Sequence, residues 1–387
     1  MTAGRPLVIL QLAANRWWTG SADPVIRLSQ GLRDRGHRVL LGLVPGGQFE
    51  DKAREAGLEP LAGLSLEPKL EPRRVLGDIT RLRRLVRQER VDVIHTHHSH
   101  DHWLAWLCRD GAALVRTFHN ARAVSLRWPA TALARRCNAV LAVSEAIHAR
   151  CREAGLAADR LFRIDPVVDA ARFGGSGGGE QIRKEFRIGA SPLIGCVARL
   201  APGRGHEPLI RGFALALSEY PDARLLLIGK GETRARLETF VAELGLGEQV
   251  LFAGYRDSDL PAVLDALDVC VLMAAGSDES CRAAVEAMAA GRPVVARRVG
   301  ALPGAILHGA TGLLLEDDRP ESVHAALRII LGSPERARAM GAAGRRRAME
   351  AFTPAQHAAQ TESAYGQALA ACARATRVEQ QSRRRHS

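Results

Sequence analysis

Short β-branched and aliphatic runs alternate with helical patterns along the whole chain of 387 residues, and this alternation limits the possible fold more than any other feature. The predicted strands lie at 6–12, 38–44, 92–96, 113–117, 139–143, 161–164, 193–197, 224–228, 249–252, 269–273, 293–296 and 312–315. The predicted helices lie at 23–35, 48–56, 73–88, 101–108, 130–136, 145–153, 206–219, 232–244, 259–266, 282–290, 301–307 and 320–331. Strands that alternate with helices form parallel sheets with right-handed crossovers, so an α/β, doubly wound fold is expected.

A glycine-rich run at residues 174–179 falls near the middle of the chain and is typical of a flexible connection. The predicted segments are a first doubly wound domain over 1–173, a linker over 174–187, a second doubly wound domain over 188–352, a last helix over 353–375 that packs back on the first domain, and a disordered basic tail over 376–387. The two domains are expected to face each other across a cleft, with ligands at the carboxyl ends of the strands.

The composition is that of a globular protein, with 47% hydrophobic and 25% charged residues. The net charge is +12, and residues 1–187 hold most of the excess, with 30 Lys and Arg against 20 Asp and Glu. Many of these cations fall in one predicted helix and the turn after it: Arg73, Arg74, Arg81, Arg83, Arg84, Arg87 and Arg90. Such a cluster suits an anionic membrane surface or an acidic lipid-linked substrate, and a solvated helix face is the competing interpretation. No nucleic-acid-binding motif accompanies it, so no nucleic-acid partner is expected.

Seven cysteines are scattered along the chain without a C-x-x-C pair, which indicates a reducing compartment and neither a disulfide framework nor a zinc site. No apolar run is long enough to span a membrane. The apolar run 7–14 is interpreted as a first strand and not as a secretory signal. A cytoplasmic location is therefore expected, with peripheral contact at the inner face of the cell membrane left open.

The segment 277–295 is the strongest functional signal. It begins as an acidic loop, continues as a helix of small residues and ends at Gly291 before a buried strand. Asp278 and Glu286 stand eight residues apart across the loop and the helix. A loop-to-helix junction at the end of a parallel strand offers backbone N–H groups and a positive dipole end to an anion, and carboxylates accept hydrogen bonds from sugar hydroxyls. Together these features predict a site for a sugar nucleotide.

Two arginines precede this segment, on a loop with glycine and proline after the predicted strand 193–197. Loop glycines allow the backbone to approach a ligand closely, and the guanidinium groups of Arg199 and Arg204 can bind phosphate oxygens. Two glycine-containing turns follow, Gly229-Lys230-Gly231 and Gly254-Tyr255-Arg256. A lone loop arginine is usually solvated, but the ordered series of motifs is a strong signal.

This series resembles the donor domain of family 4 glycosyltransferases, which are retaining enzymes with two Rossmann-like domains, the GT-B architecture. The resemblance covers nearly the whole chain. It implies that Arg199 and Arg204 bind the donor diphosphate. It also implies that Asp278 contacts donor-sugar hydroxyls and that Glu286 holds the ribose. The remaining donor contacts that it implies are backbone groups beside the sugar and phosphate and a turn beside the base: Ser280, Cys281, Arg282, and Gly254, Tyr255, Arg256.

Three positions depart from the family pattern. Arg204 replaces a lysine, Asp278 replaces a glutamate, and the run Ser280-Cys281-Arg282 replaces a stretch that commonly contains Phe-Gly. The reaction class is expected to survive these changes, but the donor sugar stays undetermined. A charged contact from Arg282 to the donor or the acceptor is an additional expectation.

The first half carries matching motifs. The loop after its first strand contains Gly20 and Ser21, where the family places a glycine-rich loop near the diphosphate and the acceptor. The segment 92–97 reads D-V-I-H-x-H, and the resemblance places His97 at a strand end that faces the cleft. His119 follows the next strand and resembles the family histidine near the reacting sugar. Five histidines within 95–102 also admit a metal site, but their spacing is not that of a helical zinc pair, and the resemblance implies that no metal is needed.

The reaction that the resemblance implies is transfer of a sugar from a nucleoside diphosphate sugar to a hydroxyl of a glycan or lipid-linked acceptor. It implies retention of the anomeric configuration, front-face attack, and no metal or other cofactor. The catalytic residues implied are His119, Asp278, Arg199 and Arg204. The charge asymmetry suggests an acceptor in cell-envelope lipopolysaccharide or polysaccharide biosynthesis.

Two other functions stay open. A sugar-nucleotide epimerase shares the two-domain architecture, and product formed without any acceptor would identify it. A catalytically silent sugar-nucleotide-binding protein could use the same fold. A dehydrogenase is disfavoured because no G-x-G-x-x-G follows the first predicted strand.

Overall fold

The structure is a computed structural model that describes residues 5–67, 71–128, 130–174, 177–276 and 278–385. The chain forms two compact units. Unit 1 comprises Met1–Ile164 and Pro354–Ser387, and unit 2 comprises Asp165–Thr353.

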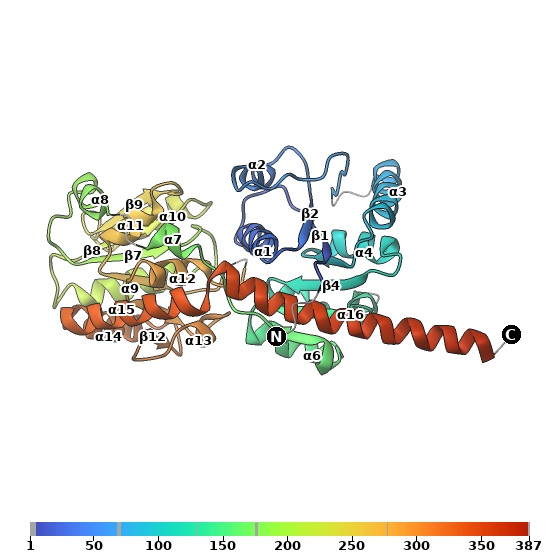
Figure 1. Ribbon diagram of the computed structural model, residues 1–387. Helices are drawn as coiled ribbons and strands as arrows, with labels where there is room; N and C mark the ends of the chain where they lie inside the picture. Colours follow the sequence, from blue (N-terminus) through green and yellow to red (C-terminus); the bar gives the residue numbers. More distant parts are fainter. Residues whose placement is uncertain (1–4, 68–70, 129, 175–176, 277, 386–387) are drawn as a thin grey trace. The chain divides into compact units, whose positions relative to one another are not determined.

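Unit 1 is built on a six-stranded parallel sheet with the strand order β2-β1-β3-β4-β5-β6 (Figure 1). Its strands are β1 (Val8–Ala13), β2 (Arg38–Leu43), β3 (Val93–Thr96), β4 (Ala113–Phe118), β5 (Ala139–Ala142) and β6 (Leu161–Arg163). Its helices are α1 (Ala22–Asp34), α2 (Gln48–Glu55), α3 (Pro72–Gln88), α4 (Ser99–Cys108), α5 (Ala130–Ala134), α6 (Glu145–Glu153) and α16 (Pro354–Arg385), with short 3-10 turns η1 (Ala121–Ala123) and η2 (Ala158–Arg160).

Helices cover both faces of this sheet, so its strands are apolar on both sides. Successive residues of β1 point to opposite faces. Ile9 packs into a core with α1, α6 and α16, whereas Leu10 packs into a second core with α3 and α4. The arrangement explains why the strands read as continuous apolar runs and not as an alternating pattern.

Unit 2 repeats the plan, with a parallel sheet in the order β12-β11-β10-β7-β8-β9. Its strands are β7 (Leu193–Val197), β8 (Arg224–Ile228), β9 (Val250–Gly254), β10 (Val269–Leu272), β11 (Val294–Arg297) and β12 (Gly312–Leu315). Its helices are α7 (Ala170–Phe173), α8 (Gly179–Glu185), α9 (His206–Ala216), α10 (Arg234–Glu243), α11 (Leu260–Ala266), α12 (Arg282–Ala289), α13 (Leu302–Ala305), α14 (Pro320–Leu331) and α15 (Pro334–Ala351). The predicted α/β, doubly wound fold is therefore confirmed for each unit.

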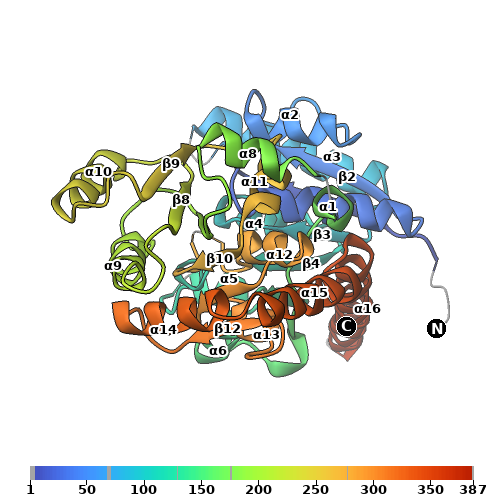
Figure 2. The same cartoon turned by 90° about the vertical axis from the view of Figure 1, so that its left-hand side faces the viewer.

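Close packing of α12 depends on its small residues. The helix lies between the sheet and α15, as Figure 2 shows. Ala284, Ala287 and Ala289 are fully buried there. A Cβ on Gly341 of α15 would lie 2.1 Å from the carbonyl oxygen of Gly291, so glycine is required where α15 passes the end of α12. Helix α15 itself was not among the predicted helices.

The boundaries of the units differ from the predicted ones. Val168 and Phe173 belong to the core of unit 2, so the chain leaves unit 1 after Ile164 and not after residue 173. Within the predicted linker, α8 packs against α11 and buries Ile182. A Cβ on Gly179 would lie 2.8 Å from the backbone of Asp265, so this glycine permits a close contact and does not provide flexibility.

The last helix also extends further than predicted. Helix α16 packs against α1, β4 and β5 of unit 1. It continues to Arg385, through most of the segment 376–387 for which disorder was expected. No helix in the described part of the chain is both long enough and apolar enough to cross a membrane.

Candidate active site

Each sheet has one point where the strand order reverses, and ligands of doubly wound folds bind at such points. In unit 2, β7 lies between β8 and β10, so the loops after β7 and β10 leave the sheet side by side. In unit 1, β1 lies between β2 and β3, so the loops after β1 and β3 do the same. Eight of the predicted site residues fall on these loops: Gly20, Ser21, His97, Arg199, Arg204, Asp278, Ser280 and Cys281. The others follow β4, lie at the end of β9 or just after it, or lie on α12.

Tight backbone contacts shape the loop after β7. The amide of Leu200 donates to the carbonyl of Lys230 at 3.1 Å, and the amide of Ala198 donates to that of Ile228 at 3.0 Å. Gly229 has φ of +151°, and a Cβ there would lie 2.0 Å from the carbonyl oxygen of Ala198. Any other residue would push the loop away, because that separation is far inside van der Waals contact. The glycines of the Gly229-Lys230-Gly231 turn are therefore needed to position the arginine loop.

The two arginines of this loop have different surroundings. Arg199 is 65% exposed and pairs with Glu232 at 2.9 Å. A backbone hydrogen bond at Glu232 and the pairing with Arg199 hold the pKa of Glu232 below its usual range. Arg204 lies against Gly276, where a Cβ would come within 2.4 Å of its guanidinium. Burial lowers the pKa of His206 to about 4, and the charge of Arg204 contributes to this decrease. The structure therefore brings Arg204 next to the acidic loop after β10.

Asp278 is buried and organises the turn that starts α12. Its Oδ1 accepts a hydrogen bond of 2.9 Å from the amide of Ser280, and its carbonyl accepts one of 3.4 Å from the amide of Cys281. Cys281 has φ of +54°, an uncommon conformation for a residue other than glycine. Two of the three amides predicted to face a ligand therefore donate to Asp278 here. The Ser280 hydroxyl is buried and has no hydrogen-bond partner among the described residues, which leaves it available to a ligand.

Glu286 lies one turn into α12 and is also buried. Arg282 forms an ion pair with it at 3.1 Å. A buried carboxylate can accept hydrogen bonds from vicinal hydroxyls. The ribose contact of Glu286 stays a prediction.

The turn after β9 is only partly suited to the role expected of it. The amide of Gly229 donates to the carbonyl of Gly254 at 2.8 Å, and Tyr255 is 54% exposed with Lys230 over its ring at 4.8 Å. Arg256 instead turns toward α8 and α11, where it pairs with Glu185 and with Asp259. Its engagement with two carboxylates indicates a structural contribution.

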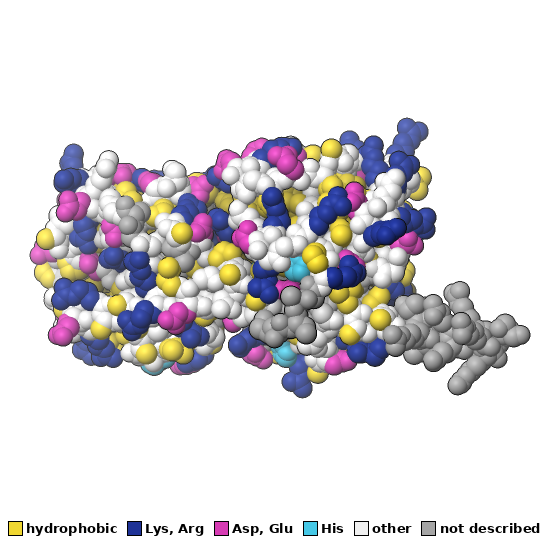
Figure 3. Space-filling view, in the orientation of Figure 1, with side chains coloured by type: hydrophobic (Ala, Val, Ile, Leu, Met, Phe, Trp, Pro, Cys, Tyr) yellow, Lys and Arg dark blue, Asp and Glu magenta, His cyan; other side chains and the backbone are white. Residues whose placement is uncertain are grey.

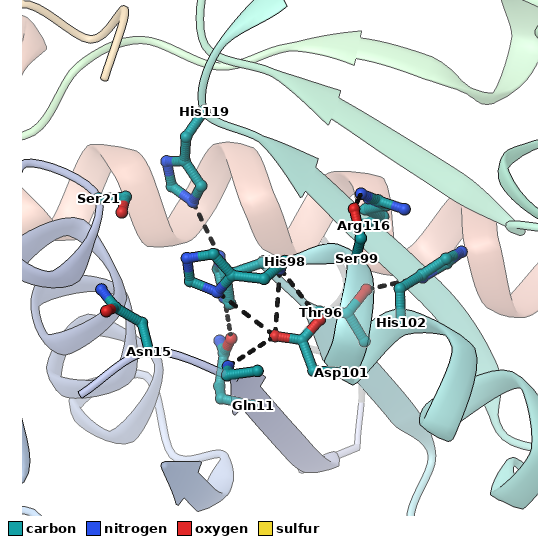
Figure 4. A network of polar contacts seen from close by, with 12 residues as sticks. Gln11, Asn15, Ser21, Thr96, His98, Ser99, Asp101, His102, Arg116 and His119 are labelled. Carbon is teal, nitrogen blue, oxygen red and sulfur yellow. Dashed lines mark hydrogen bonds and ion pairs between the residues drawn. The ribbon is translucent and has the colours of Figure 1, made fainter. Parts of the chain in front are cut away.

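In unit 1, the loop after β1 carries Gly20 and Ser21. The hydroxyl of Ser21 lies 3.1 Å from that of Thr19, and Asn15 donates to Thr19 at 3.2 Å. The start of the loop is held from α4, since Oδ2 of Asp101 accepts from the amide of Ala14 at 2.9 Å. Figure 4 shows Asn15 and Ser21 on one side of the histidine cluster.

The histidines after β3 and β4 form one buried network (Figure 4). His97 Nδ1 lies 3.1 Å from His119 Nε2, and His97 Nε2 lies 2.8 Å from Gln11 Oε1. The structure therefore brings together the two predicted histidines, which are 22 residues apart in the chain.

His95 and His97 are neutral at ordinary pH, because burial lowers the pKa of each. Burial, reinforced by His119 and His357, lowers the pKa of His95 to about 3. Burial and the neighbouring imidazoles lower the pKa of His97 well below its usual value. A neutral imidazole can both donate and accept a hydrogen bond, so the cluster can bind hydroxyl groups as well as a metal ion. No group of three or more His, Cys, Asp or Glu side chains arranged as a metal site occurs in the ranges that the structure describes.

Sequence reasoning missed the residues that α16 contributes. His357, Thr361 and Tyr365 are spaced by four, so they lie on one face of the helix, and all three are buried. Tyr365 Oη lies 2.7 Å from His95 Nδ1, and His357 is close enough to lower the pKa of His95 and His97. The polar stripe at i, i+4 and i+8 in an otherwise apolar helix face was the available signal.

Two family profiles match the chain. The one described as Glycosyltransferase Family 4 matches residues 19–172, and the one described as Glycosyl transferases group 1 matches residues 179–347. A D-inositol 3-phosphate glycosyltransferase of Corynebacterium glutamicum (strain R) is 31% identical over 313 residues, which cover 73% of this chain and 74% of that protein. A GDP-mannose-dependent alpha-(1-6)-phosphatidylinositol monomannoside mannosyltransferase of Mycolicibacterium smegmatis is 33% identical over 198 residues, 49% of this chain and 52% of that protein. The chain thus spans about half the length of such mannosyltransferases.

Solved structures with the same fold include Anabaena Alr3699/HepE in complex with UDP and glucose, with a TM-score of 0.77 and 21% identity over 92% of this chain and 98% of that one. A glycosyltransferase from Rickettsia africae ESF-5 has a TM-score of 0.81 and 18% identity over 95% of this chain and 99% of that one. At such identities the likeness shows the fold alone, which is that of GT-B proteins.

Proposed function

Because this chain belongs to glycosyltransferase family 4, we propose that it moves a sugar from a nucleoside diphosphate sugar to a hydroxyl group of an acceptor. The observation that carries the proposal is the contact of Arg204 with Gly276, which joins the arginine loop after β7 to the acidic loop after β10. Two loops that bear opposite charges at a strand-order reversal suit a ligand with both a diphosphate and hydroxyl groups.

Donor binding in this proposal uses unit 2. Arg199 and Arg204 bind the diphosphate, and Asp278 contacts hydroxyls of the sugar. Glu286 holds the ribose, and the Gly254-Tyr255 turn lies beside the base. Ser280, with its buried hydroxyl, and the backbone at Cys281 and Arg282 complete the binding of sugar and phosphate. A ligand would compete with Asp278 for the hydrogen bonds that the amides of Ser280 and Cys281 donate to it.

The proposed chemistry retains the anomeric configuration and needs no metal. The bond between the anomeric carbon and the diphosphate oxygen breaks, and the acceptor oxygen bonds to the same face of that carbon. The departing phosphate takes the acceptor proton. Negative charge grows on the diphosphate during this step, so fixed guanidinium groups stabilise the transition state more than the ground state.

Residues of unit 1 have separate roles in the proposal. His119 accepts or donates a hydrogen bond to a hydroxyl of the donor sugar, and His97 supports it. The loop with Gly20 and Ser21 contacts the diphosphate and the acceptor. The neutral state of His95 and His97 favours hydroxyl partners over phosphate in this part of unit 1.

The proposed acceptor is a glycan or lipid-linked molecule of the cell envelope, in lipopolysaccharide or other polysaccharide synthesis. Relatives named for D-inositol 3-phosphate and for phosphatidylinositol monomannoside support an acceptor that carries a phosphate. The excess of cations in residues 1–187 likewise supports a negatively charged acceptor.

We also propose peripheral contact with an anionic membrane, at the cytoplasmic face, through α3. In Figure 3, Lys and Arg side chains gather over the part of unit 1 that holds α3. Leu76 on this helix is 65% exposed, so an apolar side chain stands among the cations. Part of the charge is already paired, since Arg74 binds Glu71 at 2.7 Å and Arg87 binds Asp110 at 2.7 Å. The test is binding of the protein to phosphatidylglycerol vesicles at low and high salt. No binding, or binding that does not weaken as salt is added, would contradict this contact.

The test of the main proposal is a thermal-shift panel of UDP-, GDP-, ADP- and CMP-sugars, followed by product analysis with and without an acceptor. One donor at about 100 times its Kd should add roughly 2.7 kcal/mol of stability and raise Tm by several degrees. Sugar transfer with retained configuration in the presence of EDTA is the expected reaction. A changed sugar nucleotide formed without an acceptor would instead identify an epimerase, and binding without turnover would identify a silent protein.

A further inference from the structure

A single line of hydrogen bonds runs from β4 through the C-terminal helix to His119. Thr117 Oγ1 lies 2.7 Å from His95 Nε2, and His95 Nδ1 lies 2.7 Å from Tyr365 Oη. Gln11 Nε2 lies 3.4 Å from Tyr365 Oη. From Gln11 the line continues through His97 to His119, so residues from β1, β3, β4 and α16 are linked side chain to side chain.

The direction of each hydrogen bond follows from the chemistry of its members. Gln11 Oε1 can only accept, so His97 Nε2 carries a proton and donates to it. His97 is neutral, because its burial lowers its pKa well below the usual value. Its Nδ1 is therefore an acceptor, and the proton of the next bond must come from His119 Nε2.

The same reasoning sets the other half of the line. Tyr365 keeps its proton, since burial raises the pKa of its phenol. The Tyr365 hydroxyl accepts from Gln11 Nε2 and donates to His95 Nδ1, and His95 Nε2 then donates to Thr117. With the amide turned over, every hydrogen bond of the line would reverse and each imidazole would take the other tautomer. The orientation of the Gln11 amide, with Oε1 toward His97 and Nε2 toward Tyr365, therefore sets the tautomers.

We infer that Tyr365 and Gln11 are positioning residues that hold His97 and His119 in the tautomer with the proton on Nε2. In the neutral form of His119, Nδ1 is then a hydrogen-bond acceptor. In Figure 4 this nitrogen points to the side of the network on which Asn15 and Ser21 lie.

The tautomer determines which ligand group His119 prefers. An acceptor nitrogen takes a hydrogen bond from a hydroxyl and repels the oxygen of an ionised phosphate. This inference deepens the proposed function and rests on it for the identity of the ligand: the group that meets His119 is a sugar hydroxyl and not the diphosphate.

The tautomer can be measured without any substrate. Protein labelled with ¹⁵N-histidine gives separate long-range ¹H–¹⁵N patterns for the two neutral tautomers, and His119 is assigned by the signals that His119→Asn removes. The expected spectrum at pH 7.5 shows His97 and His119 both protonated on Nε2 and unprotonated on Nδ1. Protonation of His119 on Nδ1 would overturn the inference.

Variants test the roles of the two positioning residues. Tyr365→Phe keeps the buried ring and removes only the hydroxyl, and Gln11→Met keeps the length of the side chain and removes both polar atoms. Each should convert the single tautomer of His119 to a mixture. The matched control is Tyr220→Phe in unit 2, which makes the same change outside the network and should leave the spectrum unchanged. An unchanged spectrum in a folded Tyr365→Phe protein would show that Tyr365 does not position His119. If a variant does not fold, the wild-type spectrum still tests the tautomer of His119.

Kinetics separate this inference from the proposed function. If a donor is found, Tyr365→Phe should lower kcat by about tenfold, the effect of one hydrogen bond, and leave the Kd of the free nucleoside diphosphate unchanged. The predicted tautomer together with no transfer from any donor would contradict the transferase and keep the inference. Sugar transfer together with the opposite tautomer would support the transferase and contradict the inference.

Discussion

Nε of Arg282 lies 3.1 Å from Oε1 of Glu286, one turn further along α12. The pair joins a residue predicted to contact the donor or acceptor to the one predicted to hold the ribose. The side chain of Glu286 is only 7% exposed, so the guanidinium also limits the directions from which a ligand can reach the carboxylate. Binding at Glu286 and the position of Arg282 should therefore be coupled.

Glu286→Gln should weaken binding of the matching nucleoside diphosphate about tenfold or more. Hydrogen bonds to a charged group contribute about 1.5–3 kcal/mol, and the amide keeps the shape of the side chain but not its charge. Calorimetric titration measures the change. Glu316→Gln is the control, because Glu316 is also paired with an arginine, Arg298 at 2.8 Å, but lies exposed after β12. Equal affinities of both variants and the wild type would disprove the ribose contact.

Arg199→Ala should lower kcat/KM about 100-fold without a loss of stability. One charge contact that forms in the transition state contributes about 3 kcal/mol. The ion pair of Arg199 with Glu232 is exposed, so its removal should hardly change Tm. Arg234→Ala removes a similar exposed pair, with Glu238 at 2.8 Å, and should leave both quantities near their wild-type values. Turnover of Arg199→Ala near the wild-type level would refute the assignment.

Gly229→Ala should destabilise unit 2 by about 3 kcal/mol or more, since it combines a strained φ with a steric overlap. The added Cβ would lie 2.0 Å from the carbonyl oxygen of Ala198. Gly247→Ala is the matched change, because a Cβ at that position meets no atom within 4 Å. Chemical denaturation of both variants gives the comparison. If Gly229→Ala were as stable as Gly247→Ala, the arginine loop would not depend on the close contact.

Stability should fall as the pH is lowered from about 6.5, the usual pKa of histidine in an unfolded chain. His95 takes up a proton in the folded state only near pH 3, and the pKa of His97 and of His102 is also lowered far by burial. Between these values the unfolded state binds more protons, so the free energy of unfolding decreases with falling pH, by about 1.4 kcal/mol per unit for each such histidine.

Urea denaturation at pH 7, 6 and 5 measures this slope. His102→Gln should reduce this slope by the contribution of one histidine, since His102 is buried and its Nδ1 lies 2.9 Å from the Thr96 hydroxyl. Identical slopes for the wild type and His102→Gln would show that His102 is not neutral in the folded protein.

Local sequence was sufficient for the elements that hold the site. The strands at 193–197, 224–228 and 312–315 were predicted with the bounds that the structure has. Buried parallel strands are short apolar runs between glycine-containing turns, and this signal needs no distant partner. The segment 277–295 was likewise readable, because its loop, helix and strand follow one another in the chain.

Contacts between distant segments were not readable from the sequence. The glycine run at 174–179 was interpreted as a linker, but Gly179 lies against Asp265, and only the packing of α8 on α11 gives that glycine its purpose. Arg256 was assigned to a ligand by its position in a motif, whereas its carboxylate partner Glu185 lies 71 residues away.

The succession of strands along the chain, the twofold repetition of the α/β plan and the loops that carry the arginines and acids could all be predicted from the sequence, because periodicity and glycine placement are local properties. The tertiary structure alone decided that Tyr365 reaches His95 and Gln11 and so links α16 to the histidine network. A hydrogen bond between residues 354 positions apart exists only once the chain has folded, since its two ends meet through packing and not through sequence.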